Sequence, residues 1–99
     1  MDSKIYDLSP VYYSQKGYYG KAKIIMLDSE WEILLSYDKK ILFYDGKNVF
    51  IYPNLCYDKH LSNTTMKHIR EFLYQKGYKT LIKNSKDILI SALKILEEE

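Results

Sequence analysis

One segment of this 99-residue chain carries the signals of both a helix start and a helix stop. Ser62 or Asn63 can accept hydrogen bonds from the free N–H groups of a first turn, and Gly77 can adopt the left-handed conformation that ends a helix. Between them, apolar side chains recur with helical spacing at Met66, Ile69, Phe72 and Leu73. We therefore predict an amphipathic helix over residues 62–77, packed against a second layer.

Upstream of this helix the hydrophobic pattern changes to a period of two. Four segments rich in β-branched and aromatic residues cover 21–27, 30–37, 40–44 and 47–52. They are separated by the pairs Asp28-Ser29, Asp38-Lys39 and Asp45-Gly46. The Asp-Gly pair suits the positive φ angles of a type I′ hairpin turn. The pattern predicts an antiparallel meander of four strands.

Alternation along the second of these strands separates two sets of side chains. Trp31, Ile33, Leu35 and Tyr37 share one side, and Glu32, Leu34 and Ser36 share the other. We expect the more apolar set to lie beneath the helix. The remaining strand surface is too apolar to be fully exposed to solvent, because it carries Leu34, Leu42, Tyr44 and Phe50. We therefore expect the N-terminal arm or another protein to cover it.

The remaining segments complete the predicted architecture. Residues 1–18 have weak periodicity and are interpreted as an N-terminal arm, and residues 53–61 as a loop. Residues 84–99 carry a broad apolar stripe that predicts a second helix. The expected fold is one α+β domain over residues 1–99, in which a four-stranded antiparallel meander (19–52) packs against two C-terminal α-helices.

Several positions together resemble a known family. They are Tyr19-Gly20-Lys21-Ala22, Ser36-Tyr37, Ser62, Thr64-Thr65, His68-Ile69, Phe72-Leu73, Gln75 and Gly77. In these residues the chain resembles a family of small domains of unknown function from phages and mobile elements of Gram-positive bacteria. It differs in having Lys67 where members often carry Arg, and in a longer loop at 53–61. The resemblance implies a compact α+β fold and a phage setting, in which small proteins such as anti-CRISPR proteins block host defence factors.

Two polar groups of residues invite a chemical interpretation. Thr64, Thr65 and His68 form a polar cluster at the helix start, which is either a catalytic or binding group or the ordinary capping of a helix. Cys56, His60 and His68 are the available metal-ligand set, but their spacing is unlike that of known zinc sites. We predict no catalytic residues, no metal and no cofactor.

Tyrosine is unusually frequent, at 11 residues, and suits interfaces because it combines a large rigid surface with one polar atom. Biased genomic composition is the alternative explanation. The residues expected to bind a partner are Tyr44, Tyr52, Lys67, Arg70 and Lys76. Basic residues around the helix also allow a nucleic-acid surface, although the net charge of +2 argues for weak binding at most.

Composition sets the expected compartment and function. No apolar run approaches the ~20 residues of a membrane helix, and one cysteine fits a reducing environment. We expect a cytoplasmic, non-enzymatic phage or mobile-element protein that binds and inhibits a host protein, with a CRISPR–Cas nuclease or another defence factor as the expected target. A small nucleic-acid-binding accessory or regulatory protein is the alternative.

Overall fold

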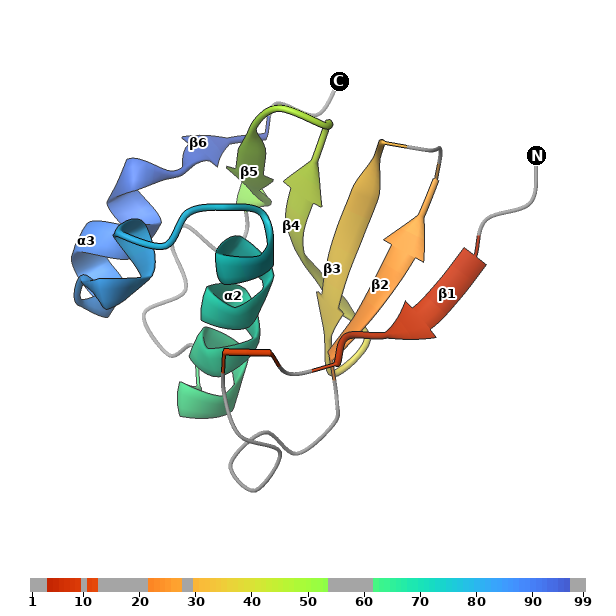
Figure 1. Ribbon diagram of the computed structural model, residues 1–99, viewed down its shortest axis with the longest axis horizontal. Coiled ribbons are helices and arrows are strands. Elements are labelled where there is room, and N and C mark those ends of the chain that lie inside the picture. Colours follow the sequence, from red (N-terminus) through yellow and green to blue (C-terminus); the bar gives the residue numbers. More distant parts are fainter. Residues whose placement is uncertain (1–3, 10, 13–21, 28–29, 54–61, 97–99) are drawn as a thin grey trace.

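The computed structural model describes residues 4–9, 11–12, 22–27, 30–53 and 62–96. Over these residues the chain forms one six-stranded sheet whose strand order follows the sequence (Figure 1). The strands are β1 (Lys4–Asp7), β2 (Ala22–Met26), β3 (Glu32–Ser36), β4 (Lys39–Tyr44), β5 (Val49–Ile51) and β6 (Lys94–Ile95). Strands β1 to β5 pair antiparallel with their neighbours, and β6 pairs parallel with β5. The α+β class is confirmed, with six strands instead of four.

Helix α2 (Asn63–Gln75) lies where its start and stop signals predict it. The Ser62 hydroxyl caps the helix by accepting a hydrogen bond from the Thr65 N–H at 3.1 Å. Beyond the last turn, Gly77 has a φ of 95°, a conformation that glycine adopts without steric cost. The four apolar positions that define the stripe are all buried: Met66, Ile69, Phe72 and Leu73.

The hydrophobic core lies between the helices and one face of the sheet. Phe72 and Leu73 of α2 share a cluster with Leu34 of β3 and with Leu89 of helix α3 (Lys86–Ala92). A short 3₁₀ turn at Leu81–Lys83 joins the two helices, and Figure 1 shows α2 lying between α3 and the strands. Neither α2 nor α3 combines the length and the apolar character needed to cross a membrane.

The face of β3 that packs beneath α2 is the opposite of the predicted one. Glu32, Leu34 and Ser36 point toward the helix and are buried, whereas Trp31 is 50% exposed on the other side. The prediction that Trp31, Ile33 and Leu35 lie beneath the helix was therefore wrong, whereas the Tyr37 ring, in the turn after β3, lies 6.0 Å from the ring of His68 on α2. The prediction rested on apolar content alone, whereas Glu32 and Ser36 can be buried because Glu32 bonds to Lys76, the C-cap residue of α2, and Ser36 bonds to His68 within it.

The type I′ geometry predicted for Asp45-Gly46 is found instead at the β3–β4 turn. Tyr37 and Asp38, between β3 and β4, have φ angles of 52° and 67°, and a type I′ turn requires positive φ at both positions. The hairpin at Asp45-Gly46 is present, but as a longer loop over residues 45–48. There the Asp45 carboxylate accepts hydrogen bonds from the N–H groups of Lys47 at 2.9 Å and Asn48 at 2.7 Å.

Both ends of the described chain contribute strands that the sequence pattern did not predict. Strand β1 lies within the expected arm and pairs with β2. At the other end, α3 stops at Ala92 instead of continuing to residue 99, and Lys94–Ile95 pairs with β5. The predicted helix over 84–99 was wrong for residues 93–96, because hydrogen bonding to the edge of β5 replaces a further helical turn there, and residues 97–99 lie outside the described residues.

Candidate interaction surface

A buried polar cluster joins the start of α2 to β3. The Ser36 hydroxyl lies 2.7 Å from Nδ1 of His68 and 3.2 Å from Oγ1 of Thr65. The Ser62 hydroxyl donates to Thr65 at 3.1 Å, and Thr64 is half-buried beside it. A serine hydrogen-bonded to a histidine is the arrangement of a nucleophile and its base. Here Ser36 and His68 are 1% and 0% exposed, so a substrate has no access to the hydroxyl, and the cluster fastens helix to sheet.

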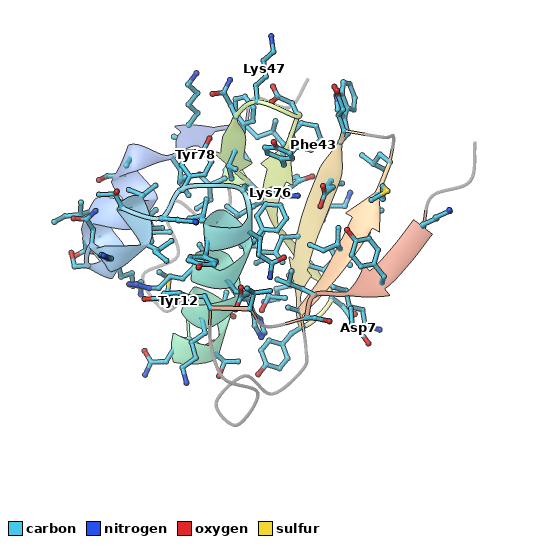
Figure 2. The ribbon with its side chains drawn as sticks, in the orientation of Figure 1. Asp7, Tyr12, Phe43, Lys47, Lys76 and Tyr78 are labelled. Carbon is cyan, nitrogen blue, oxygen red and sulfur yellow. The ribbon has the colours of Figure 1, made fainter. Side chains whose placement is uncertain are left out.

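Glu71 plays a similar fastening role for the N-terminal segment. Its fully buried carboxylate accepts the Tyr12 N–H at 2.9 and 3.1 Å and the Gln75 side-chain amide at 2.9 Å. Gln75 also donates to the Ser9 carbonyl oxygen at 2.9 Å. The ring of Tyr12, which Figure 2 labels, packs 4.9 Å from the ring of Tyr74. Sequence reasoning missed this group. The available signal was the four-residue spacing of two polar side chains within an otherwise apolar helix surface.

A third contact between sheet and helix is an ion pair. Nζ of Lys76 lies 2.6 Å from the Glu32 carboxylate, and 4.7 and 5.2 Å from the ring centroids of Tyr44 and Phe72 (Figure 2). The ammonium group is thus neutralised on one side and placed over aromatic rings on the other. Burial, followed by the nearby Glu32 carboxylate, raises the pKa of the Tyr6 phenol above its ordinary 10.0.

The Glu32–Lys76 ion pair borders a pocket of about 260 Å³ between α2 and an N-terminal segment of residues 6–9 and Val11. Its walls combine the ion pair with the Gln75 amide and apolar side chains such as Leu8 and Ile24. Ligand sites usually span about 300–1,000 Å³ with polar groups aimed at the ligand. In this pocket Lys76 bonds to Glu32 and the Gln75 amide bonds to the Ser9 carbonyl oxygen, so it is a weak candidate for a small-molecule site.

The two tyrosines expected to bind a partner lie on the helix side of the sheet. The Tyr44 ring packs edge-on against Phe72 at 6.5 Å, and its hydroxyl donates to the Gly46 carbonyl oxygen at 2.9 Å. Tyr52 is half-buried and packs against the core. Their role in partner binding stays a prediction, and the structure gives both a packing role as well.

The three basic residues expected to bind a partner do not form one group. Lys76 lies against Tyr44, whereas the Arg70 guanidinium donates to the carbonyl oxygens of Ile82 at 3.2 Å and Asn84 at 3.4 Å. Lys67 is half-exposed on α2. The structure therefore brings Tyr44 and Lys76 together and places Arg70 against the segment that leads into α3.

Of the weak metal-ligand set, Cys56 and His60 lie outside the described residues. His68 is described, and its Nδ1 atom is hydrogen-bonded to Ser36. Among the residues that the structure does describe, no three His, Cys, Asp or Glu side chains gather closely enough to hold a metal ion.

The sheet face turned away from α2 carries an apolar row, and we call this face the open face. Cross-strand register aligns the row, one residue from each of β1 to β5: Ile5, Ile25, Ile33, Phe43 and Phe50. Trp31 joins the row by packing edge-on against Phe43 at 5.7 Å. None of these side chains belongs to the core cluster, and within the described residues neither helix covers them.

Of the comparisons with known proteins, the one with protein families finds a match. Neither the curated proteins nor the solved structures contain a match to this sequence. A family model described as "Family of unknown function (DUF8033)" matches residues 6–90, which include β2 to β5, α2 and the polar cluster, together with parts of β1 and α3. The chain belongs to this family of unknown function.

Proposed function

We propose that this protein is a non-enzymatic phage or mobile-element protein that binds and inhibits a host protein in the host cytoplasm. The proposed target is a CRISPR–Cas nuclease or another defence factor. The resemblance of its Thr-Thr-x-x-His-Ile-x-x-Phe-Leu segment to small phage domains supports the setting. The open face supports the binding role and is the observation that carries this proposal.

An apolar row that spans five strands outside the helix-side core cluster, and that neither described helix covers, is unusual for a protein that acts alone. Ile5 is 61% exposed and Trp31 50% exposed, although both are large apolar residues. At the centre of the row Ile33 is buried and Phe43 and Phe50 are half-buried, so the most exposed apolar residues are at its borders. An apolar patch that is continuous across strands marks interaction sites, while single scattered apolar residues do not. Inhibition by binding needs such a rigid surface and no reactive group.

Capture and reconstitution test the proposal. The tagged chain is expressed in a bacterial host that is then infected, and co-purifying host proteins are identified by mass spectrometry. We expect one host protein to bind the purified chain directly and to lose its nuclease or defence activity when the chain is added. Direct binding without any loss of activity would contradict the inhibitory role, and absence of any direct binder would contradict the proposal as a whole.

The second candidate is a small nucleic-acid-binding accessory protein, which one observation favours. Trp31, Phe43 and Phe50 lie on the same sheet face as Lys23 and Lys40, and aromatic rings with lysines can stack bases and contact phosphates. Fluorescence anisotropy with single- and double-stranded DNA at increasing salt tests this alternative. A steep linear fall of log affinity with log salt would favour it over the first proposal.

A further inference from the structure

We infer that the open face binds an acidic segment of a protein partner, through an apolar centre and a lysine rim. This inference rests on the proposed function and names the surface and the partner chemistry. The apolar centre follows from register, because Ile33, Phe43 and Phe50 lie opposite one another on adjacent strands. Adjacent strands are about 4.8 Å apart, so the five-residue row is about 19 Å long.

The row has a compact centre and exposed borders, as binding sites on protein surfaces do. Its centre is compact, since Ile33 is only 6% exposed between its neighbours, while Ile5 and Trp31 at its borders are exposed. The Phe43 ring contacts Trp31 on one side and Phe50, at 6.3 Å, on the other. Rigid aromatic anchors in such a centre supply most of the affinity of typical protein interfaces.

The rim of the open face is basic. Lys23 and Lys40 lie on either side of Leu35 in the register, and Lys94 lies opposite Phe50 on β6. All three lysines are exposed. Asp7 is the acidic residue that the register places on this face among the described strands, next to Lys23. Charge complementarity across an interface therefore calls for carboxylates on the partner.

Two other occupants fit these observations less well. A second copy of the chain would bring another set of rim lysines to the same surface, where like charges oppose association. A nucleic acid needs ring faces that are free for base stacking. Here the Trp31 and Phe43 rings meet at an interplanar angle of 74°, so they cover part of each other's surface, and Ile25, Ile33 and Leu35 are aliphatic.

The experiment measures binding of the host protein recovered by capture, purified, to variants of the full chain. Trp31→Ala removes an exposed anchor, and the double variant Lys23→Glu/Lys40→Glu reverses the rim charge without touching the core. We expect each to weaken binding at least about tenfold. The matched control Lys47→Glu/Lys79→Glu makes the same charge change at exposed positions on other surfaces, and should bind as the parent does. Circular dichroism melting curves confirm that each variant is folded.

Carbodiimide cross-linking adds a direct readout, since it joins lysine amines to carboxylates in contact. We expect cross-links from Lys23, Lys40 or Lys94 to Asp or Glu residues of the partner. Unchanged binding by both open-face variants would overturn this inference while leaving the proposed function standing on another surface. Self-association in sedimentation, or DNA binding, that Trp31→Ala abolishes would also overturn it in favour of a second copy or a nucleic acid. If no host protein binds, the inference and the proposed function both fail.

Discussion

The two faces of the sheet are similarly rich in apolar side chains but differ in how their polar neighbours are satisfied. On the covered face, the buried polar residue Glu32 contacts Lys76, which caps the end of α2, and the buried Ser36 contacts His68 within α2. On the open face, the polar neighbours of the apolar row are lysines that reach solvent. Burial of a polar group is costly unless it is hydrogen-bonded, so the helix can only lie where partners exist.

This difference shows what determines which face is buried. Counting apolar residues on β3 favours the face of Trp31 and Ile33, yet α2 packs on the face of Glu32 and Ser36. The helix supplies a matched partner for each buried polar group of that face, and these pairs fix its position along the strand. Because only the open face lacks a covering helix within the described residues, it is the face on which we place the partner.

The largest expected effect comes from a matched pair of phenylalanine truncations. Phe72→Ala should reduce the free energy of unfolding by about 3–5 kcal/mol, because the ring is fully buried between α2 and the sheet. Phe50→Ala on the open face should cost about 1 kcal/mol, because only part of its ring is buried. Urea denaturation measures both values. Equal losses would mean that the two faces are equally part of the core.

A smaller effect should follow from removing one hydroxyl of the polar cluster. Ser36→Ala should cost about 1–3 kcal/mol, since it leaves the buried His68 and Thr65 without that hydrogen-bond partner. Ser91→Ala makes the same chemical change at an exposed position, where the hydroxyl donates to the Ile88 carbonyl oxygen at 3.0 Å. The Ser91 variant should unfold within about 0.5 kcal/mol of the parent. A Ser36 variant as stable as the Ser91 variant would show that the cluster does not hold the helix.

The smallest effect concerns the β4–β5 loop, which belongs to neither face. Hydrogen bonds from the N–H groups of Asn48 and then Lys47 hold the pKa of the Asp45 carboxyl below its ordinary 3.8. A lowered folded-state pKa contributes stability that is present above pH 3.8 and is lost as the pH falls through the folded-state value. NMR titration should show the midpoint below 3.8. In an Asp45→Ala variant, the free energy of unfolding should no longer show the loss at low pH that comes from this carboxyl.

The elements with strong local signals could be predicted from the sequence. The capping serine and Gly77 located α2, and alternation between aspartate-led turns located β2 to β5 within one or two residues. These signals act between neighbours in the chain, so a sequence alone contains them. The resemblance likewise led to a family of unknown function, which the family model over residues 6–90 confirms.

The errors concern features that depend on distant partners. The stripe over residues 84–99 fits a helix, but Lys94–Ile95 pairs with β5, a contact that no local pattern encodes. The orientation of β3 was wrong because the partners of Glu32 and Ser36 lie far along the chain on α2. At the candidate site, Trp31 and Phe43 could be identified as apolar but not as the residues left outside the core. Register across five strands was needed to align them with Phe50.

Strand β6 covers an edge of β5 that would otherwise be free. The short turns between β2 and β5 join neighbouring strands, whereas β6 reaches β5 only after both helices have been placed. Its attachment is small, ending with the Leu96 N–H on the Ile51 carbonyl oxygen at 2.8 Å. A strand of two residues makes few contacts and therefore opens locally at little free-energy cost. Each opening would uncover the edge of β5, whose free backbone groups could then pair with the strand of another molecule. While the two-residue strand β6 is paired with β5, the backbone groups of that edge are occupied, which disfavours edge-to-edge aggregation there.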